Sequence, residues 1–173
     1  MAAWQGPSES RTAQPLNQET PMPTTIFEAL RESHDIQRQL CTRLIRSRSG
    51  TAAKEATFMD LKIELEAHAA AEERYLYCPI LMDDNGLTPS RHALSEHHEI
   101  EEILEDMSVN DKSTAAWQKK AVELGQTVRH HLKEEERGFF QQAGKILTDK
   151  QKVALAGKYR RDLKRMKKVL SNP

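Results

Sequence analysis

The sequence is poor in the residues on which several protein classes depend. Its 2 cysteines, Cys41 and Cys78, are too few for a disulfide framework in a chain of 173 residues. With 7 glycines, 7 prolines and 5% aromatic residues, a β-sandwich or β-barrel is not expected. No apolar run approaches the roughly 20 residues that span a bilayer. These absences favour a helical protein of a reducing compartment, which we expect to be the cytoplasm.

The chain also lacks net charge, because 26 Lys and Arg balance 26 Asp and Glu. Overall attraction to nucleic acid or to an acidic membrane is therefore not indicated, and neither is expected as a partner. Locally the charge is uneven: residues 145–173 hold ten Lys or Arg and two Asp, whereas residues 96–106 hold six Asp or Glu. Such runs usually mark solvated helix faces.

The first segment differs in composition from the rest of the chain. Residues 1–23 are rich in Pro, Ser, Gln and Thr, show no apolar period and lack the basic and apolar parts of a secretory signal. We expect a disordered leader there. Apolar periodicity and capping residues predict five helices after it, at about residues 25–47, 51–81, 88–107, 114–144 and 148–170.

Four long amphipathic helices with short connections predict an all-α fold, an up-down-up-down four-helix bundle. We assign the bundle to residues 24–147. The fifth helix, in residues 148–173, is basic and is expected to pack on the bundle or to trail from it. Gly144 is expected to mark a bend or the end of the fourth helix.

One polar motif occurs twice, in two different helices. His68 and Glu72 are followed by Glu73 and Arg74, and the same His-x-x-x-Glu-Glu-Arg pattern recurs at residues 131–137. Residues four apart lie on one helix face, about 6 Å apart along the axis. A histidine and a glutamate so placed can reach the same metal ion.

The apolar period places these motifs inside the bundle. On the second helix the stripe of Phe58, Leu61 and Leu65 continues into His68 and Glu72, and the repeat in the fourth helix has the same phase. By the same phase His34 and His97 point inward, whereas His98 and His130 point outward. The inward polar set is therefore His34, His68, Glu72, His97, His131 and Glu135.

Two carboxylates in a small apolar core are costly unless they are paired or bound to cations. A single inward histidine is more often an ordinary core residue, but this explanation fails for six polar residues in core phase. Cations would neutralise the carboxylates and occupy the imidazole lone pairs. Mixed imidazole and carboxylate ligands suit iron, manganese or zinc, and two carboxylates favour two ions. We expect a pair of iron ions, with the six residues as metal ligands.

The sequence resembles the hemerythrin-like family of HHE cation-binding domains over about residues 24–145. The resemblance rests on Ser33-His34-Asp35-Ile36-Gln37-Arg38, on the two His-x-x-x-Glu-Glu motifs with Pro79 beyond the first, and on Glu96-His97-His98-Glu99-Ile100. It implies a four-helix bundle around a non-haem di-iron centre. By position, the four inward histidines resemble terminal ligands and Glu72 and Glu135 resemble the bridging carboxylates.

One difference from oxygen-carrying hemerythrins concerns the third helix, where that group has two histidines four residues apart. Here Ala93 and Glu101 occupy the positions four before and four after His97, and His92 is five residues away. Glu101, His92 or water remains open as a further ligand. The difference argues against reversible oxygen transport and would leave room for peroxide or nitric oxide to reach iron, or for iron to be bound and released.

Three functional hypotheses follow. The first is a di-iron protein that binds or senses O2, NO or peroxide, or that handles iron. The second is a redox enzyme on the same scaffold, with peroxidase-like, catalase-like or NO-reducing activity, for which no catalytic residue is identified. The third is a metal-free helical interaction module. A redox partner protein is a further candidate partner, and the oligomeric state stays open.

Overall fold

The computed structural model describes residues 24–172, so the predicted disordered leader at residues 1–23 lies outside the described part. All regular elements in the described part are helical, which confirms the all-α prediction. The elements are α1 (Ile26–Arg46), α2 (Ala52–Glu72), the π-helical turn η1 (Glu73–Tyr77), α3 (Cys78–Leu81), α4 (Asp84–Val109), α5 (Ala115–Glu134), the π-helical turn η2 (Glu135–Phe139), α6 (Phe140–Ile146) and α7 (Asp149–Leu170).

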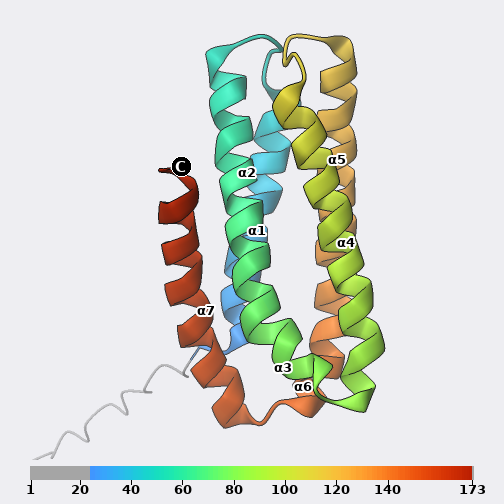
Figure 1. The fold of residues 1–173 in the computed structure, drawn as a ribbon, viewed down its shortest axis with the longest axis vertical. Coiled ribbons are helices and arrows are strands. Elements are labelled where there is room, and N and C mark those ends of the chain that lie inside the picture. Colours follow the sequence, from blue (N-terminus) through green and yellow to red (C-terminus); the bar gives the residue numbers. More distant parts are fainter. Residues whose placement is uncertain (1–23, 173) are drawn as a thin grey trace, which may run out of the picture.

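The bundle runs up and down as predicted (Figure 1). α1 ascends, α2 descends through η1 into α3, α4 ascends, and α5 descends through η2 into α6. α7 then rises along the outside of the bundle, where it packs against α1 and α2. Among residues 24–172, no helix has both the length and the apolar character needed to cross a membrane.

Short polar side chains begin most of the long helices. Thr25, Thr51, Thr114 and Thr148 each accept a hydrogen bond from a backbone N–H in the first turn of the helix that follows. Such caps satisfy donors that have no partner within the helix. The predicted boundaries near residues 25, 51, 114 and 148 therefore lie close to the observed ones.

The start of α4 was predicted too late. The helix begins at Asp84 with Asp83 as its cap, so that Pro89 lies inside it rather than at its first turn. Proline lacks the N–H that would bond to the Asn85 carbonyl four residues earlier. The Gln142 side chain donates to that carbonyl instead, at 3.5 Å. Gly144 is likewise inside α6, which continues to Ile146.

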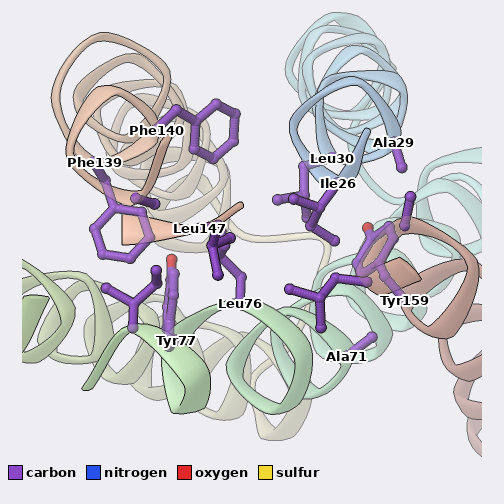
Figure 2. Packing of buried hydrophobic residues seen from close by; sticks show 14 of the residues in the cluster. Ile26, Ala29, Leu30, Ala71, Leu76, Tyr77, Phe139, Phe140, Leu147 and Tyr159 are labelled. Atoms are coloured by element: carbon purple, nitrogen blue, oxygen red, sulfur yellow. The ribbon is translucent and has the colours of Figure 1, made fainter. Parts of the chain in front are cut away.

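The core consists of two apolar clusters separated by a polar layer. One cluster surrounds Ile26, Leu76 and Tyr159 at the end where α3 and α6 lie (Figure 2). The other surrounds Phe58 and Trp117 nearer the opposite end. Along their helices, His34 on α1 and His68 on α2 fall between the residues of the two clusters. The polar layer is therefore closed off from water at both ends of the bundle.

The first turn of α4, which packs against the end of α3, depends on a glycine. A Cβ added at Gly86 would lie 2.1 Å from the Ile80 carbonyl oxygen and 2.5 Å from the Ile80 Cγ2. We therefore expect Gly86→Ala to lower the free energy of unfolding by about 1–3 kcal/mol through overpacking. Urea unfolding should show this loss as a lower midpoint.

Gly138→Ala is the matched control, because a Cβ there meets nothing within 4 Å. Its midpoint should be equal to or above that of the wild type, because alanine favours a helix more than glycine does. Equal midpoints for the two variants would contradict the close approach at Gly86.

Candidate metal centre

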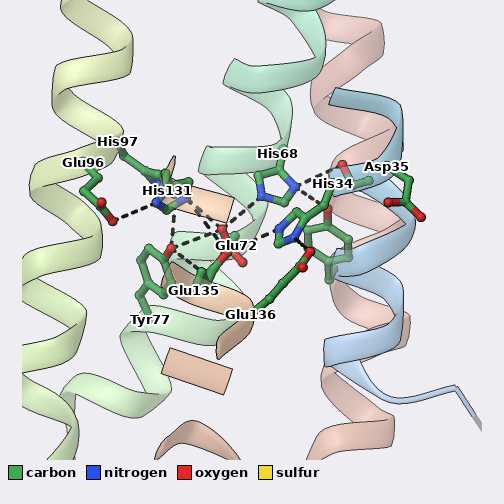
Figure 3. A network of polar contacts seen from close by, with 12 residues as sticks. His34, Asp35, His68, Glu72, Tyr77, Glu96, His97, His131, Glu135 and Glu136 are labelled. Carbon is green, nitrogen blue, oxygen red and sulfur yellow. Dashed lines mark hydrogen bonds and ion pairs between the residues drawn. The ribbon is translucent and has the colours of Figure 1, made fainter. Parts of the chain in front are cut away.

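The six residues that the periodicity placed inward lie together in the polar layer between α1, α2, α4 and α5 (Figure 3). None is more than 9% exposed. The two carboxylates lie at the centre, with two imidazoles on each side. The six residues are His34, His68, Glu72, His97, His131 and Glu135.

Their donor atoms form two overlapping groups, each with atoms within 4.8 Å of one another. The first group contains His34, His68, Glu72 and Glu135. His68 Nε2 lies 3.1 Å from Glu72 Oε2, and His34 Nε2 lies 3.3 Å from Glu135 Oε2. Four donors from three helical segments therefore converge on one point.

The second group contains Glu72, His97 and His131. His97 Nε2 lies 3.5 Å from Glu72 Oε2 and 3.1 Å from His131 Nε2. Because Glu72 belongs to both groups, it stands where a carboxylate shared by two cations would stand. Glu135 also reaches toward this side, with Oε2 3.9 Å from His131 Nε2.

Several donor atoms of the cluster are buried without a hydrogen-bond partner in the described residues. They are His34 Nε2, His68 Nε2, Glu72 Oε1 and Glu135 Oε2. Buried polar atoms are normally satisfied, and leaving them unpaired costs free energy. Metal cations would satisfy these atoms, and imidazole with carboxylate is a donor set that transition metals accept. The residues therefore fit a metal pair.

A π-helical turn begins at the end of each His-x-x-x-Glu pair: η1 begins at Glu73, directly after Glu72, and η2 begins at Glu135 itself. A π turn contains an extra residue and often occurs at functional sites. It brings Tyr77, five residues after Glu72, into the interior beside Leu76. The Tyr77 hydroxyl donates to Glu135 Oε1 at 2.8 Å and lies 3.3 Å from Glu72 Oε2. The sequence puts Tyr77 near the site, but a regular three- or four-residue spacing does not predict its contact with the two carboxylates.

Each of the four inward histidines has a hydrogen-bond partner at its outer ring nitrogen, Nδ1. Three of these partners are carboxylates, which hold the proton on Nδ1 and leave the Nε2 lone pair facing inward. The pairs are His34 with Glu136 at 2.8 Å, His97 with Glu73 at 2.8 Å and His131 with Glu96 at 3.0 Å. The second glutamate of each repeated motif thus orients a histidine of another helix.

The partner of the fourth histidine comes from the C-terminal helix. His68 Nδ1 lies 2.8 Å from the Tyr159 hydroxyl of α7 and 3.0 Å from the Ser33 hydroxyl. Ser33 donates to Glu64 at 2.7 Å, and Glu64 forms an ion pair with Lys167 of α7. The sequence predicts that this helix packs on the bundle or trails from it, with solvated charges, but it assigns Tyr159 no place at the centre, although Tyr159 shares an apolar phase with Leu155.

The electrostatics of the cluster favour positive charge on His34 and His97, whereas burial lowers the pKa of His68. Burial alone would lower the pKa of His34, but the carboxylates of Glu135 and Glu136 raise it to about 9. For His97 burial again opposes the charge, and Glu72 and Glu73 nevertheless raise the pKa to about 10. The hydrogen bond from His34, helped by Arg38, lowers the pKa of Glu136 to about 2.

The two side chains left open as further ligands do not reach the interior. His92 is exposed and contacts Glu134 and Glu96 on the outer face of α4 and α5. Glu101 is exposed and lies 3.7 Å from the likewise exposed His98. Neither residue therefore replaces the histidine that oxygen-carrying hemerythrins have where this chain has Ala93.

A cavity of about 330 Å³ leads from the surface between α2 and α4 to His68, His97 and His131. Gln37 lines it, and this amide is only 1% exposed with Nε2 unpartnered in the described residues. A small molecule could therefore approach the cluster. Apolar side chains such as Leu65, Ile100 and Leu104 also line the cavity, together with the acidic residues Glu66, Glu73 and Glu101.

Comparison with protein families identifies the chain. The profile of the hemerythrin HHE cation binding domain matches residues 25–143. The chain belongs to this hemerythrin family. The family match and the buried His and Glu groups make it a metal-binding hemerythrin-like protein. They favour this reading over a metal-free interaction module.

A solved structure supports the same fold. The crystal structure of a hemerythrin HHE cation binding domain-containing protein from Mycobacterium kansasii superposes with a TM-score of 0.77 at 19% sequence identity. The match covers 84% of this chain and 89% of the other, so it extends beyond the 25–143 segment of the family profile. No curated protein matches the sequence.

The Tyr159 contact makes α7 part of this hemerythrin-like centre. Loss of an outer partner of a metal-ligating histidine typically lowers metal affinity 10–100-fold. Because Ser33 remains beside His68, we expect Tyr159→Phe to weaken the affinity for a divalent metal ion by about tenfold, the lower end of that range. Anaerobic competition with a chelator would measure the change.

Tyr75→Phe is the control, since Tyr75 packs against the same apolar cluster but is not part of the polar layer. It should keep wild-type affinity. If Tyr159→Phe also kept it, the hydroxyl would have no part in positioning His68.

Proposed function

We propose that this protein holds two iron ions in its polar layer and uses them to bind or sense a small oxidant or diatomic ligand such as O2, NO or peroxide. The observation that carries the proposal is the sharing of Glu72 between two groups of inward donors, several of them buried without a partner. Iron is preferred over manganese or zinc because its redox change suits such ligands.

The chain's own residues divide the work of holding the ions. His34 and His68 would hold one ion, His97 and His131 the other, and Glu72 would be shared. Glu135 has an oxygen near histidines of both groups and can contribute to either. Bound there, iron would supply the electrons that are exchanged with a diatomic ligand or peroxide.

Other residues would control what reaches the centre. The cavity between α2 and α4 admits a small molecule, while the apolar clusters at both ends exclude bulk water. The Gln37 amide can donate a hydrogen bond to a molecule in the cavity. Tyr77 keeps its hydroxyl proton directed at Glu135, and burial beside Glu135 and Glu72 raises the pKa of this hydroxyl.

The fixed surroundings favour a resident metal pair over iron cargo. Each histidine is held by an outer partner, and each inward residue is buried. Release of iron would require these contacts to open together. The iron-handling role is therefore the weaker form of the proposal.

A redox enzyme on the same residues is the second candidate, and the cavity is the observation that favours it. A substrate that reaches His97 and His131 could be turned over rather than only bound. Assays of the iron-loaded protein with peroxide and with NO distinguish the two: catalytic consumption indicates an enzyme, and stoichiometric binding indicates a carrier or sensor.

The metal proposal predicts two irons per chain and near-ultraviolet absorption from the ferric pair. Glu72→Ala should lose at least one iron per chain and the associated absorption, because Glu72 serves both donor groups. Metal analysis and optical spectra would measure this, with circular dichroism to verify folding. Glu99→Ala, which removes an exposed glutamate of α4, should leave both readouts unchanged.

Colourless wild-type protein that stays free of iron after anaerobic ferrous loading would contradict the proposal. Glu72→Gln offers a milder version of the test if the alanine variant does not fold. It keeps the volume of the side chain but removes its charge.

The cavity predicts a role for Gln37 in ligand affinity. Gln37→Leu should weaken NO binding to the ferrous-loaded protein by about threefold to tenfold, the net worth of one hydrogen bond, without changing iron content. NO titration followed by absorbance would measure the affinity. Gln39→Leu on the exposed face of α1 is the control and should bind as the wild type does.

A further inference from the structure

A second cluster of histidines and glutamates lies on the outer face of α4 and α5, outside the interior set. It consists of two pairs spaced four residues apart, His92 with Glu96 on α4 and His130 with Glu134 on α5. On α5 this pair is the interior His131 and Glu135 pair displaced by one residue. The same spacing that directs one pair inward therefore directs a second pair outward.

The two pairs contact each other between α4 and α5. His92 Nε2 lies 3.1 Å from Glu134 Oε2 and 3.8 Å from Glu96 Oε1. His92, Glu96 and Glu134 each offer one donor atom, and these atoms lie within 4.8 Å of one another. On the far side of Glu134, His130 Nε2 lies 3.2 Å from Oε1. Donors of both types thus converge from two helices without rearrangement of the backbone.

The cluster has carboxylates but no permanent cation. Within residues 24–172, neither Glu96 nor Glu134 forms an ion pair with a lysine or arginine, and their ion-pair contacts are all histidines. The geometry therefore offers lone pairs and negative charge at a place where positive charge is favoured.

We propose that His92, Glu96 and Glu134, with His130 beside them, form a surface site for one divalent transition-metal ion such as Zn²⁺, Co²⁺ or Fe²⁺. Imidazole nitrogen together with carboxylate oxygen suits these ions, whereas Ca²⁺ and Mg²⁺ prefer ligands that are all oxygen. Helices supply the ligands, so the four-residue spacing holds them on one face. The exposed position leaves water to complete the coordination.

The Glu96 carboxylate connects the outer site to the interior centre. Glu96 offers Oε1 toward His92, and its Oε2 accepts from His131 Nδ1 at 3.0 Å. A cation outside would draw electron density from the carboxylate that orients His131. The outer ion would thus act on the interior through a residue that belongs to both.

Zinc titration of the full-length, iron-loaded chain tests the site, with calorimetry for affinity and metal analysis for stoichiometry. The wild type should bind one Zn²⁺ per chain more than the His92→Ala, His130→Ala double variant. The single variant His92→Ala should bind this ion at least about tenfold more weakly, since loss of a direct ligand costs no less than loss of an outer partner. An equal concentration of Mg²⁺ should not displace it.

His98→Ala is the matched control. His98 is as exposed as His92, at 69% against 64%, and it also lies near two glutamates, but Glu101 and Glu102 both come from its own helix. It should keep the additional ion. Superimposable titrations of the wild type and His92→Ala, or equal loss in His98→Ala, would overturn the proposal.

The number of Zn²⁺ ions bound at the outer site can be measured whether or not the interior holds iron. The test compares the number of Zn²⁺ ions bound by the wild type and by variants that keep all six interior residues. If the protein failed to load iron, the proposed function would be wrong, but the difference in bound Zn²⁺ would still test the outer site. Conversely, loss of the outer ion without any change in iron content would leave the proposed function standing.

Discussion

Two carboxylates in a dry interior are the constraint on which the rest of this structure depends. Glu72 and Glu135 lie between apolar clusters at both ends of the bundle, where an uncompensated negative charge costs several kcal/mol. Four imidazoles surround them with their Nε2 atoms turned inward. Positive charge at the centre would offset this cost, and four buried donor atoms without a hydrogen-bond partner in the described residues lie there.

The surrounding helices keep this arrangement in place. The repeated motif places one glutamate in the interior and uses the next one to orient a histidine of another helix, as with Glu73 and His97. The π-helical turns η1 and η2 then shift the phase of each helix and bring Tyr77 against both central carboxylates. The polar layer is therefore a network in which each ligand candidate has an outer support.

The C-terminal helix is part of this network. α7 lies beyond the 25–143 segment that matches the family profile, yet Tyr159 contacts His68 and Lys167 contacts the Glu64 that accepts from Ser33. Its basic outer face is solvated, and its inner face closes the centre on the α1 and α2 side. A helix that the sequence predicts only to pack on the bundle or to trail from it thus contacts a buried histidine of the polar layer.

The sequence by itself determined the five helices, most of their caps and the inward phase of six polar residues, because periodicity and capping are local properties of the chain. The role of those six as metal ligands stays a prediction. Only the tertiary structure decided which side chains meet across helices: Tyr159 with His68, Glu96 with His131, and the cavity beside Gln37. It also placed His92 on the surface and began α4 at Asp84, because cross-helix distances and the tolerance of Pro89 depend on packing that no local pattern encodes.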